Sequence, residues 1–326
     1  MIWVAWRQQR AQVFVLLGLL VAGYVTVLLL RGAMQSDVTA LGGCLNEEWT
    51  SKACSSLVSA FKNSWFGLMT GAETVVTALP VLLGMFCTAP LIAREIEHGT
   101  HLLAFTQSIG RTRWMLTKFA VAAVPAIAVL LLMQQGVSSW LDLAGKFNPR
   151  EAGPYQGTTF GTTSVAPLSY VLFCLSFGLM LGVLTRRSLV AMAGTLATFV
   201  VLRSLLGQAY GLVGSERVIS DDPTTAQPGS GSQYSEYLDS GYLSPQGETI
   251  SKADAEPLIA QCPAHTNGTV TPGLADCYRQ HGLAKLYIDE LPPSAAPAVH
   301  WTEFAIVTGL ALLCLPIARQ ALHRRV

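Results

Sequence analysis

Long apolar stretches with few charged residues alternate with polar segments along the whole chain. Six of these stretches lie near residues 12–31, 73–93, 114–136, 166–185, 188–207 and 301–321. About 20 apolar residues in a helix cross the hydrocarbon core of a bilayer, and a charge at its centre costs several kcal/mol. The pattern therefore predicts an all-α membrane protein with six transmembrane helices.

The composition supports this prediction and excludes other classes. Of the 326 residues, 51% are apolar and 13% are charged, and the formal net charge is +1. Soluble proteins carry about 25% charged residues, so an ordinary soluble enzyme and a disordered chain are excluded. The balanced charge also provides no field for phosphates, which excludes a nucleic-acid binder.

The basic residues favour cytoplasmic positions for both termini. With the N-terminus inside, the arginine-bearing segments 94–113, 186–187 and 319–325 lie inside, where short loops usually carry Lys and Arg. Of the acidic residues, only Glu95 and Glu97 then lie inside. A signal peptide is the alternative for the first apolar stretch, but the stretch is longer than a signal core.

The same topology predicts four parts of the chain. Tryptophans and arginines within residues 1–12 indicate a cytoplasmic amphipathic helix at the membrane interface. Residues 13–207 contain transmembrane helices one to five, with an inner loop at 94–113. Residues 208–300 form an extracellular loop domain, and residues 301–326 form the sixth helix and a cytoplasmic tail.

Four cysteines fall in the predicted outer loops as two local pairs. Cys44 and Cys54 share the first outer loop, and Cys262 and Cys277 share the last one. We expect two disulfides in an oxidising compartment, with free thiols or crossed pairings as alternatives. The last pair would staple two short helices predicted near residues 253–260 and 273–286, giving a small disulfide-stapled domain before the last helix.

The motifs that would give the chain its own energy source or chemistry are missing. There is no phosphate-binding loop. The only Gly-Lys pair is at 145–146, and position 140, where the motif needs its first glycine, is Trp140. The histidines of 95–101 lack the spacing of a zinc protease, so we expect no metal site and no enzyme activity.

Ionisable residues are scarce within the spans. Glu73, Arg203 and Glu303 all lie near the predicted outer ends, which argues against an ion-coupled carrier. Arg203 is expected either to extend its charge to the interface or to pair with Glu73.

Residues 89–114, APLIAREIEHGTHLLAFTQSIGRTRW, resemble an inner loop of one transporter group. They are similar to actinobacterial ABC-transporter permeases of the bacterial type-2 exporter family, whose membrane fold is ABCG-like. The resemblance implies a coupling helix that docks on a separate ATPase subunit, with Glu95 and Glu97 facing basic groups there. The alternative is a solvated loop. The residues that the resemblance assigns to this element are Glu95, Glu97, Gly99, Thr100, Ser108, Arg111 and Arg113.

The resemblance also implies the function. The chain would be the permease subunit of an ATP-driven exporter in the bacterial cytoplasmic membrane, moving a hydrophobic or amphipathic compound such as an antibiotic, lipid or peptide. Its partners would be ABC ATPase subunits, which bind ATP and Mg²⁺, and a second permease copy or paralogue; the chain itself would hold no cofactor. The alternative is a non-transporting membrane anchor or sensor that displays its outer loop.

Four large apolar residues mark a candidate substrate path along the second and fifth spans. They can contact cargo without fixed polar demands, although ordinary bundle or lipid contact is the alternative. These residues are Met85, Phe86, Phe199 and Leu202.

Overall fold

The computed structural model describes residues 2–42, 44, 52–99, 110–155, 157–224, 235–262 and 273–325. It consists of two compact units. The membrane unit comprises residues 1–152, 156–206 and 300–326, and the sheet unit comprises residues 153–155 and 207–299.

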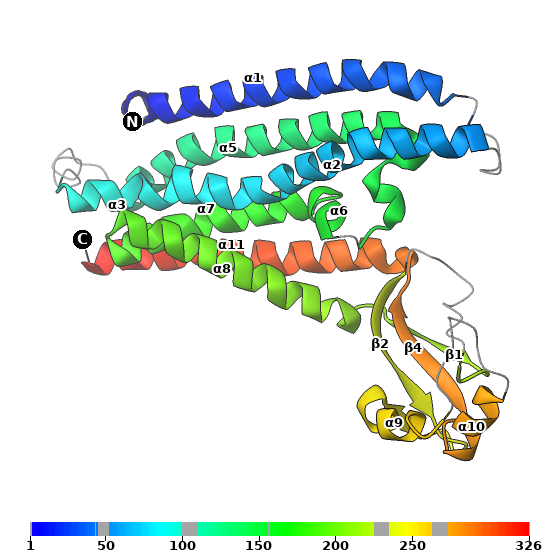
Figure 1. Ribbon diagram of the computed structural model, residues 1–326. Helices are drawn as coiled ribbons and strands as arrows, with labels where there is room; N and C mark the ends of the chain where they lie inside the picture. Colours follow the sequence, from blue (N-terminus) through cyan, green and yellow to red (C-terminus); the bar gives the residue numbers. More distant parts are fainter. Residues whose placement is uncertain are drawn as a thin grey trace. The chain divides into compact units, whose positions relative to one another are not determined.

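The membrane unit is a bundle of long helices (Figure 1). Six helical segments of the described chain are long and apolar enough to cross a membrane, as predicted. The fold class predicted from the apolar stretches is therefore confirmed. The helices are α1 (Ile2–Ala40), α2 (Lys52–Leu83), α3 (Ala89–Glu97), α5 (Arg111–Leu141), α6 (Gly157–Thr162), α7 (Ala166–Thr185), α8 (Ser188–Ala209) and α11 (Ala296–Arg325).

Several helices extend beyond the stretches predicted to span the bilayer. The segment predicted as a separate interfacial helix, residues 1–12, continues without a break into the first span as α1. Helix α2 likewise begins at Lys52, well before the second apolar stretch. Extending a helix adds one hydrogen bond per residue without a new nucleation cost, so polar flanks readily continue an apolar helix.

Helix α7 lies at the centre of the bundle and is the most buried of the six spans. It packs backbone to backbone on α2, α3 and the π-helical turn Gly84–Thr88 that joins them. A Cβ atom on Gly84 would lie 2.6 Å from the Cys174 carbonyl oxygen, and one on Gly182 would lie 2.5 Å from that of Ala89. Only glycine permits such close approach of two helices.

The π-helical turn is also tied to α7 by a side chain. The Thr88 hydroxyl donates to the Leu175 carbonyl oxygen, 2.7 Å away. Pro90 follows the turn and lacks a backbone N–H, so one α-helical hydrogen bond is missing here in any case. The second span is therefore a continuous helix with one wide turn.

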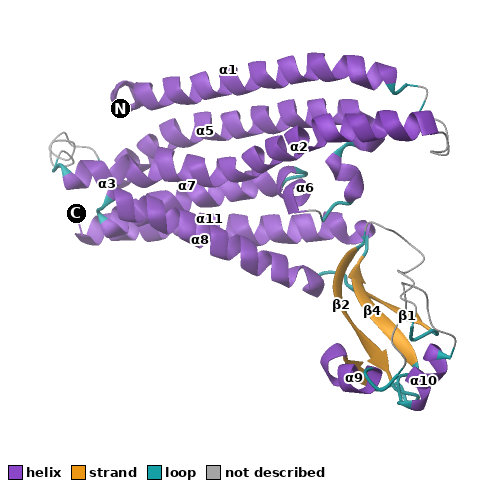
Figure 2. Cartoon of the chain, in the orientation of Figure 1, coloured by secondary structure: helices purple, strands orange, loops and turns teal. Residues whose placement is uncertain are grey.

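The sheet unit is built on a four-stranded antiparallel sheet of order β1-β4-β2-β3 (Figure 2). The strands are β1 (Glu216–Ser220), β2 (Glu236–Leu243), β3 (Thr249–Ser251) and β4 (Lys285–Leu291). Two short helices, α9 (Lys252–Ile259) and α10 (Leu274–Gln280), accompany it. Helix α9 lies where the sequence predicted it. The second helix was predicted over residues 273–286, but α10 ends at Gln280 and strand β4 begins at Lys285, and the sheet was not predicted.

The local cysteine pairs are joined as expected. Cys262 is bonded to Cys277 and links α10 to the residues after α9, which confirms the predicted disulfide before the last helix. Cys44 is bonded to Cys54, between α1 and α2. The crossed pairings left open by the sequence are therefore not the ones that form.

Candidate functional site

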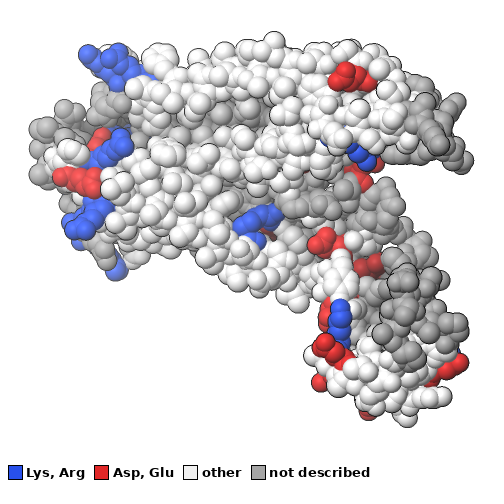
Figure 3. Space-filling view, in the orientation of Figure 1, with Lys and Arg blue, Asp and Glu red and all other residues white. Residues whose placement is uncertain are grey.

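One end of the membrane unit carries a group of basic residues, here called the basic end. Both chain termini lie at this end, and Figure 3 shows blue Lys and Arg atoms gathered there. The helix ends and turns meeting at the basic end supply Arg94, Arg111, Arg113, Arg186, Arg187, Arg319 and Arg324. Four contacts within the chain hold these helix ends together.

The first contact joins α3 to α5. Glu95, near the end of α3, forms an ion pair with Lys118 of α5. Lys118 is only 5% exposed, and its ammonium lies 4.9 Å from the centre of the Trp114 ring. A buried ammonium needs a charge partner, and Glu95 supplies it.

The second contact brings α1 to the same place. The side-chain amide of Gln9 donates to the Lys118 carbonyl oxygen, at 3.3 Å. The start of α1 therefore lies beside α5 at the level of the Glu95–Lys118 pair.

The third contact joins α3 to the beginning of α8. The Glu97 carboxylate accepts hydrogen bonds from the Ser188 backbone N–H and the Ser188 hydroxyl, each at 3.0 Å. The first N–H groups of a helix have no partner within the helix, and its N-terminus carries partial positive charge. Glu97 thus caps α8 from another helix.

These contacts give both glutamates partners within the chain, which the sequence analysis did not predict. Neither carboxylate is directed only at a partner subunit, because each binds another helix of the same chain. Lys118 and Ser188 are distant from the two glutamates along the chain, so the only signal in the sequence was a serine at the first position of a predicted helix.

The fourth contact closes the basic end against the C-terminal helix. Arg111 donates to the His323 carbonyl oxygen at 3.3 Å, and Thr112 is hydrogen-bonded to the His323 ring at 3.0 Å.

The other predicted coupling residues make no contact of this kind that the structure describes. Gly99, just after α3, has a φ of +69°, a conformation that favours glycine. Arg113 is exposed, and Thr100 and Ser108 lie outside the described residues.

Three of the four predicted path residues meet in one apolar cluster, here called the path cluster. Met85, Phe199 and Leu202 belong to it, whereas Phe86 is 58% exposed and is not one of its members. The substrate path itself stays a prediction, with Phe86 at its exposed side. The buried members of the path cluster are Val81, Ala166, Tyr170, Phe173, Cys174, Phe199, Val307 and Ala311.

A polar group adjoins the path cluster. Arg203 of α8 pairs with Glu303 of α11, with 3.1 Å between Nη1 and Oε1, and Tyr170 donates to the same carboxylate oxygen. The Arg203 guanidinium also lies 5.3 Å from the ring centres of Phe160 and Tyr170. The predicted pairing of Arg203 with Glu73 is wrong, because its acidic partner is Glu303.

Glu73 has a polar network of its own, which the sequence analysis missed. Its side chain is fully buried and forms an ion pair with Arg150, with 2.9 Å between Oε1 and Nε. Three hydroxyls of α6 also donate to the carboxylate, from Thr158, Thr159 and Thr162 at 3.2 to 3.4 Å. Hydroxyls one helical turn apart in the Thr-rich segment were the only available signal.

Among the residues that the structure describes, one group has metal-ligand chemistry. Possible ligand atoms of Cys262, Cys277 and His281 lie within 4.8 Å of one another. Because the two sulfur atoms are bonded to each other, they are not thiolates, and thiolates are the ligands that metals require. The arrangement is a disulfide beside a histidine.

Comparison with known proteins supports one family. The signature of the family described as ABC-2 membrane transporter related matches residues 17–210, more than half of the chain. Comparison with curated proteins and with solved structures gives no match. The matched region contains α2 to α8 with the basic-end contacts of Glu95 and Glu97. This multi-pass chain belongs to the ABC-2 membrane transporter related family and is a transporter permease, the membrane component of a transport system.

Proposed function

We propose that the chain is the membrane subunit of an ATP-driven exporter, with its basic end in the cytoplasm of a bacterium. The family implies an ABC ATPase partner in general, and that partner would bind ATP and Mg²⁺. The positive-inside rule supports the orientation. The observation that carries the proposal is the set of contacts by which Glu95 and Glu97 join α3 to α5 and α8.

The connection 94–113 would be the coupling element that contacts the ATPase. Its described part begins at the end of α3, and both of its carboxylates are bound to other helices. A displacement of this end of α3 would therefore be passed to α5 through Lys118 and to α8 through Ser188. Gly99, Thr100, Ser108, Arg111 and Arg113 would lie at or beside the surface that meets the partner.

The transported compound would pass along α2 and α8. Met85 of the π-helical turn after α2 shares the path cluster with Phe199 and Leu202 of α8, and such contacts accept apolar cargo without strict geometry. A hydrophobic or amphipathic compound is the class that fits. A second permease copy or a paralogue would complete the path opposite this bundle.

The test reverses the charge at Glu97 in the complete complex. Glu97→Lys should leave the chain inserted, because the side chain is exposed outside the apolar core. It should lower transport per ATP hydrolysed or weaken ATPase association, because the α8 cap is lost. Ser188→Ala, which removes one of the two hydrogen bonds, should give a smaller defect in the same direction.

The control is Glu248→Lys, an exposed glutamate of the sheet unit. Co-purification with the ATPase and transport in vesicles are measured for all variants. If Glu97→Lys binds and transports like the control, the Glu97 contact does not couple the subunits. If the unmodified chain binds no ATPase and moves no compound, the protein is an anchor or sensor instead.

A further inference from the structure

The ion pair of Arg203 and Glu303 belongs to a set of three polar side chains, here called the polar layer, whose third member is Tyr170. The three residues come from three different helices, α8, α11 and α7. Arg203 Nη1 lies 3.1 Å from Glu303 Oε1, and the Tyr170 hydroxyl donates to the same carboxylate oxygen. The Glu303 carboxylate therefore connects three of the spans at one point.

Each member of the polar layer lies one helical turn from a buried member of the path cluster. Residues four apart in a helix share a face and are separated by about one turn of 5.4 Å. Because α7 and α11 run toward the basic end and α8 runs away from it, each polar member lies on the side away from the basic end. The pairs of polar and path-cluster residues are Tyr170 with Cys174, Arg203 with Phe199, and Glu303 with Val307.

Two stacked rings lie beside the polar layer. The His300 ring is parallel to that of Phe160, with 4.1 Å between the ring centres, and His300 precedes Glu303 by three residues on α11. The Arg203 guanidinium lies 5.3 Å from the ring centres of Phe160 and Tyr170. Aromatic faces stabilise a cation where little water reaches it. Ionic and aromatic contacts thus close the path cluster at this end.

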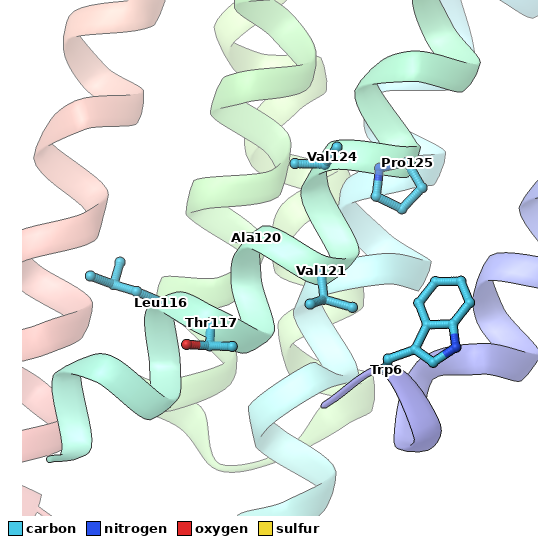
Figure 4. Close-up of a pocket in the computed structure, with 7 residues that line it drawn as sticks. All are labelled: Trp6, Leu116, Thr117, Ala120, Val121, Val124 and Pro125. Atoms are coloured by element: carbon cyan, nitrogen blue, oxygen red, sulfur yellow. The ribbon is translucent and has the colours of Figure 1, made fainter. Parts of the chain in front are cut away.

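The path cluster below the polar layer is closed to a compound in this structure. Cys174 and Val307 are fully buried, and Phe199 is 7% exposed. Such close packing leaves no room for a compound among these side chains. The open groove of about 670 Å³ in the membrane unit lies elsewhere, between Trp6 of α1 and residues 116–125 of α5 (Figure 4). Entry into the path cluster therefore requires helices to separate.

The helices that the polar layer joins differ in burial. Helix α7 is the most buried span, whereas α8 and α11 are largely exposed along their apolar lengths. The two exposed helices can therefore move with less loss of packing than α7 can. A buried ion pair is stable only while both charges stay in contact, so a small separation of α8 from α11 would break the contact between Arg203 and Glu303.

We propose that the polar layer is a latch, which closes the path cluster while Arg203 of α8 is bound to Glu303 of α11 and opens it when the two helices separate. Tyr170 is a positioning residue, because its hydrogen bond fixes the carboxylate from the less mobile α7. That the opening releases a transported compound rests on the proposed function. The latch itself is tested without transport or an ATPase.

The test measures how fast a water-soluble maleimide reacts with Cys174 in the full-length chain in nanodiscs. All seven cysteines lie within the described residues, and four of them form disulfides. Cys87→Ala with Cys314→Ala therefore leaves Cys174 as the single free thiol. Arg203→Gln and Glu303→Gln should each raise its labelling rate by at least about tenfold, because each leaves one charge of the closed latch without its partner.

Two further variants separate the latch from the mere loss of a side chain. The double variant Arg203→Glu with Glu303→Arg again places opposite charges on α8 and α11, so its labelling rate should return toward that of the unmodified latch. Tyr170→Phe removes only the hydrogen bond to the carboxylate and should raise the rate less than Glu303→Gln does.

Two controls detect general loosening of the bundle. In a chain with Cys87→Ala and Cys174→Ala, the remaining Cys314 is buried in a different cluster nearer the basic end, and the latch variants should leave its labelling rate unchanged. Glu73→Gln removes another buried carboxylate, which is paired with Arg150, and should leave the labelling of Cys174 unchanged.

Three results would overturn the latch. They are unchanged labelling of Cys174 in both single latch variants, an equal increase at Cys314 or with Glu73→Gln, and a charge-swapped chain that is labelled as fast as the single variants. If the labelling follows the prediction while the complete complex moves no compound, the latch is supported and the proposed function fails.

Discussion

Replacement of Glu73 by glutamine tests whether the polar network of Glu73, Arg150 and the α6 hydroxyls stabilises the bundle. The carboxylate is 0% exposed, and the Arg150 side chain that pairs with it is 18% exposed. Removing one partner of a buried ion pair typically costs about 3–5 kcal/mol, because the other charge is left uncompensated. Since Arg150 keeps some access to water, we expect a loss near 3 kcal/mol in the free energy of unfolding.

That loss should be visible as a lower melting temperature. For a unit of this size, 1 kcal/mol corresponds to about 2–4 °C, so Glu73→Gln should melt roughly 6–12 °C lower. The assay is thermal unfolding in detergent at one fixed scan rate, because unfolding of such proteins is commonly irreversible.

A double variant makes the test specific. In Glu73→Gln combined with Arg150→Gln, no charge is left unpaired, so the combined loss should be smaller than the sum of the single losses. Glu256→Gln, at an exposed position of the sheet unit, serves as the control. A melting temperature for Glu73→Gln equal to that of the control, or additive losses in the double variant, would refute the reasoning.

Other changes test the packing, a disulfide and an ion pair of the sheet unit. Gly182→Val should destabilise the membrane unit by about 1–3 kcal/mol in thermal unfolding, because its Cβ would meet a carbonyl oxygen at 2.5 Å, whereas Gly309→Val meets open space and should be neutral. Serine at both Cys262 and Cys277 should cost the sheet unit about 3 kcal/mol, seen as faster proteolysis of that unit, because the bridge closes a loop of 15 residues. The hydrogen bond from a guanidinium holds the pKa of Asp289 below its usual range. The stabilisation from Asp289 is therefore present at neutral pH and lost as the pH falls below about 4, and Asp289→Asn should flatten that part of the acid-unfolding curve.

The features that the sequence predicted best are those set by local apolar content. Six spans follow from long apolar stretches, and two disulfides follow from two pairs of cysteines, each pair within one loop. The sheet was missed because β1 and β3 are short and the exposed β1 reads ERVIS, with polar residues at both ends. Such segments lack the continuous alternation that identifies a longer strand.

The partners of the ionisable residues were harder to predict for a different reason. Glu73 and Arg150 are 77 residues apart, and Glu97 and Ser188 are 91 apart. Which charges meet depends on how the helices rotate and pack, and a single sequence contains no periodic signal for that. Burial alone could have indicated that Glu73 needs a partner, but not which one.

The wide turn at Gly84–Thr88 has a consequence for the angular phase of the second span. A π-helical turn holds one more residue than an α-helical turn, so every residue after it is rotated by about 100° relative to an uninterrupted α-helix. Glu95 and Glu97 lie beyond this turn, and their orientations toward Lys118 and Ser188 include that rotation. A single-residue deletion within the turn would keep the span helical and apolar while turning both carboxylates away from their partners. The length of this one turn thus determines the direction in which Glu95 and Glu97 point at the basic end.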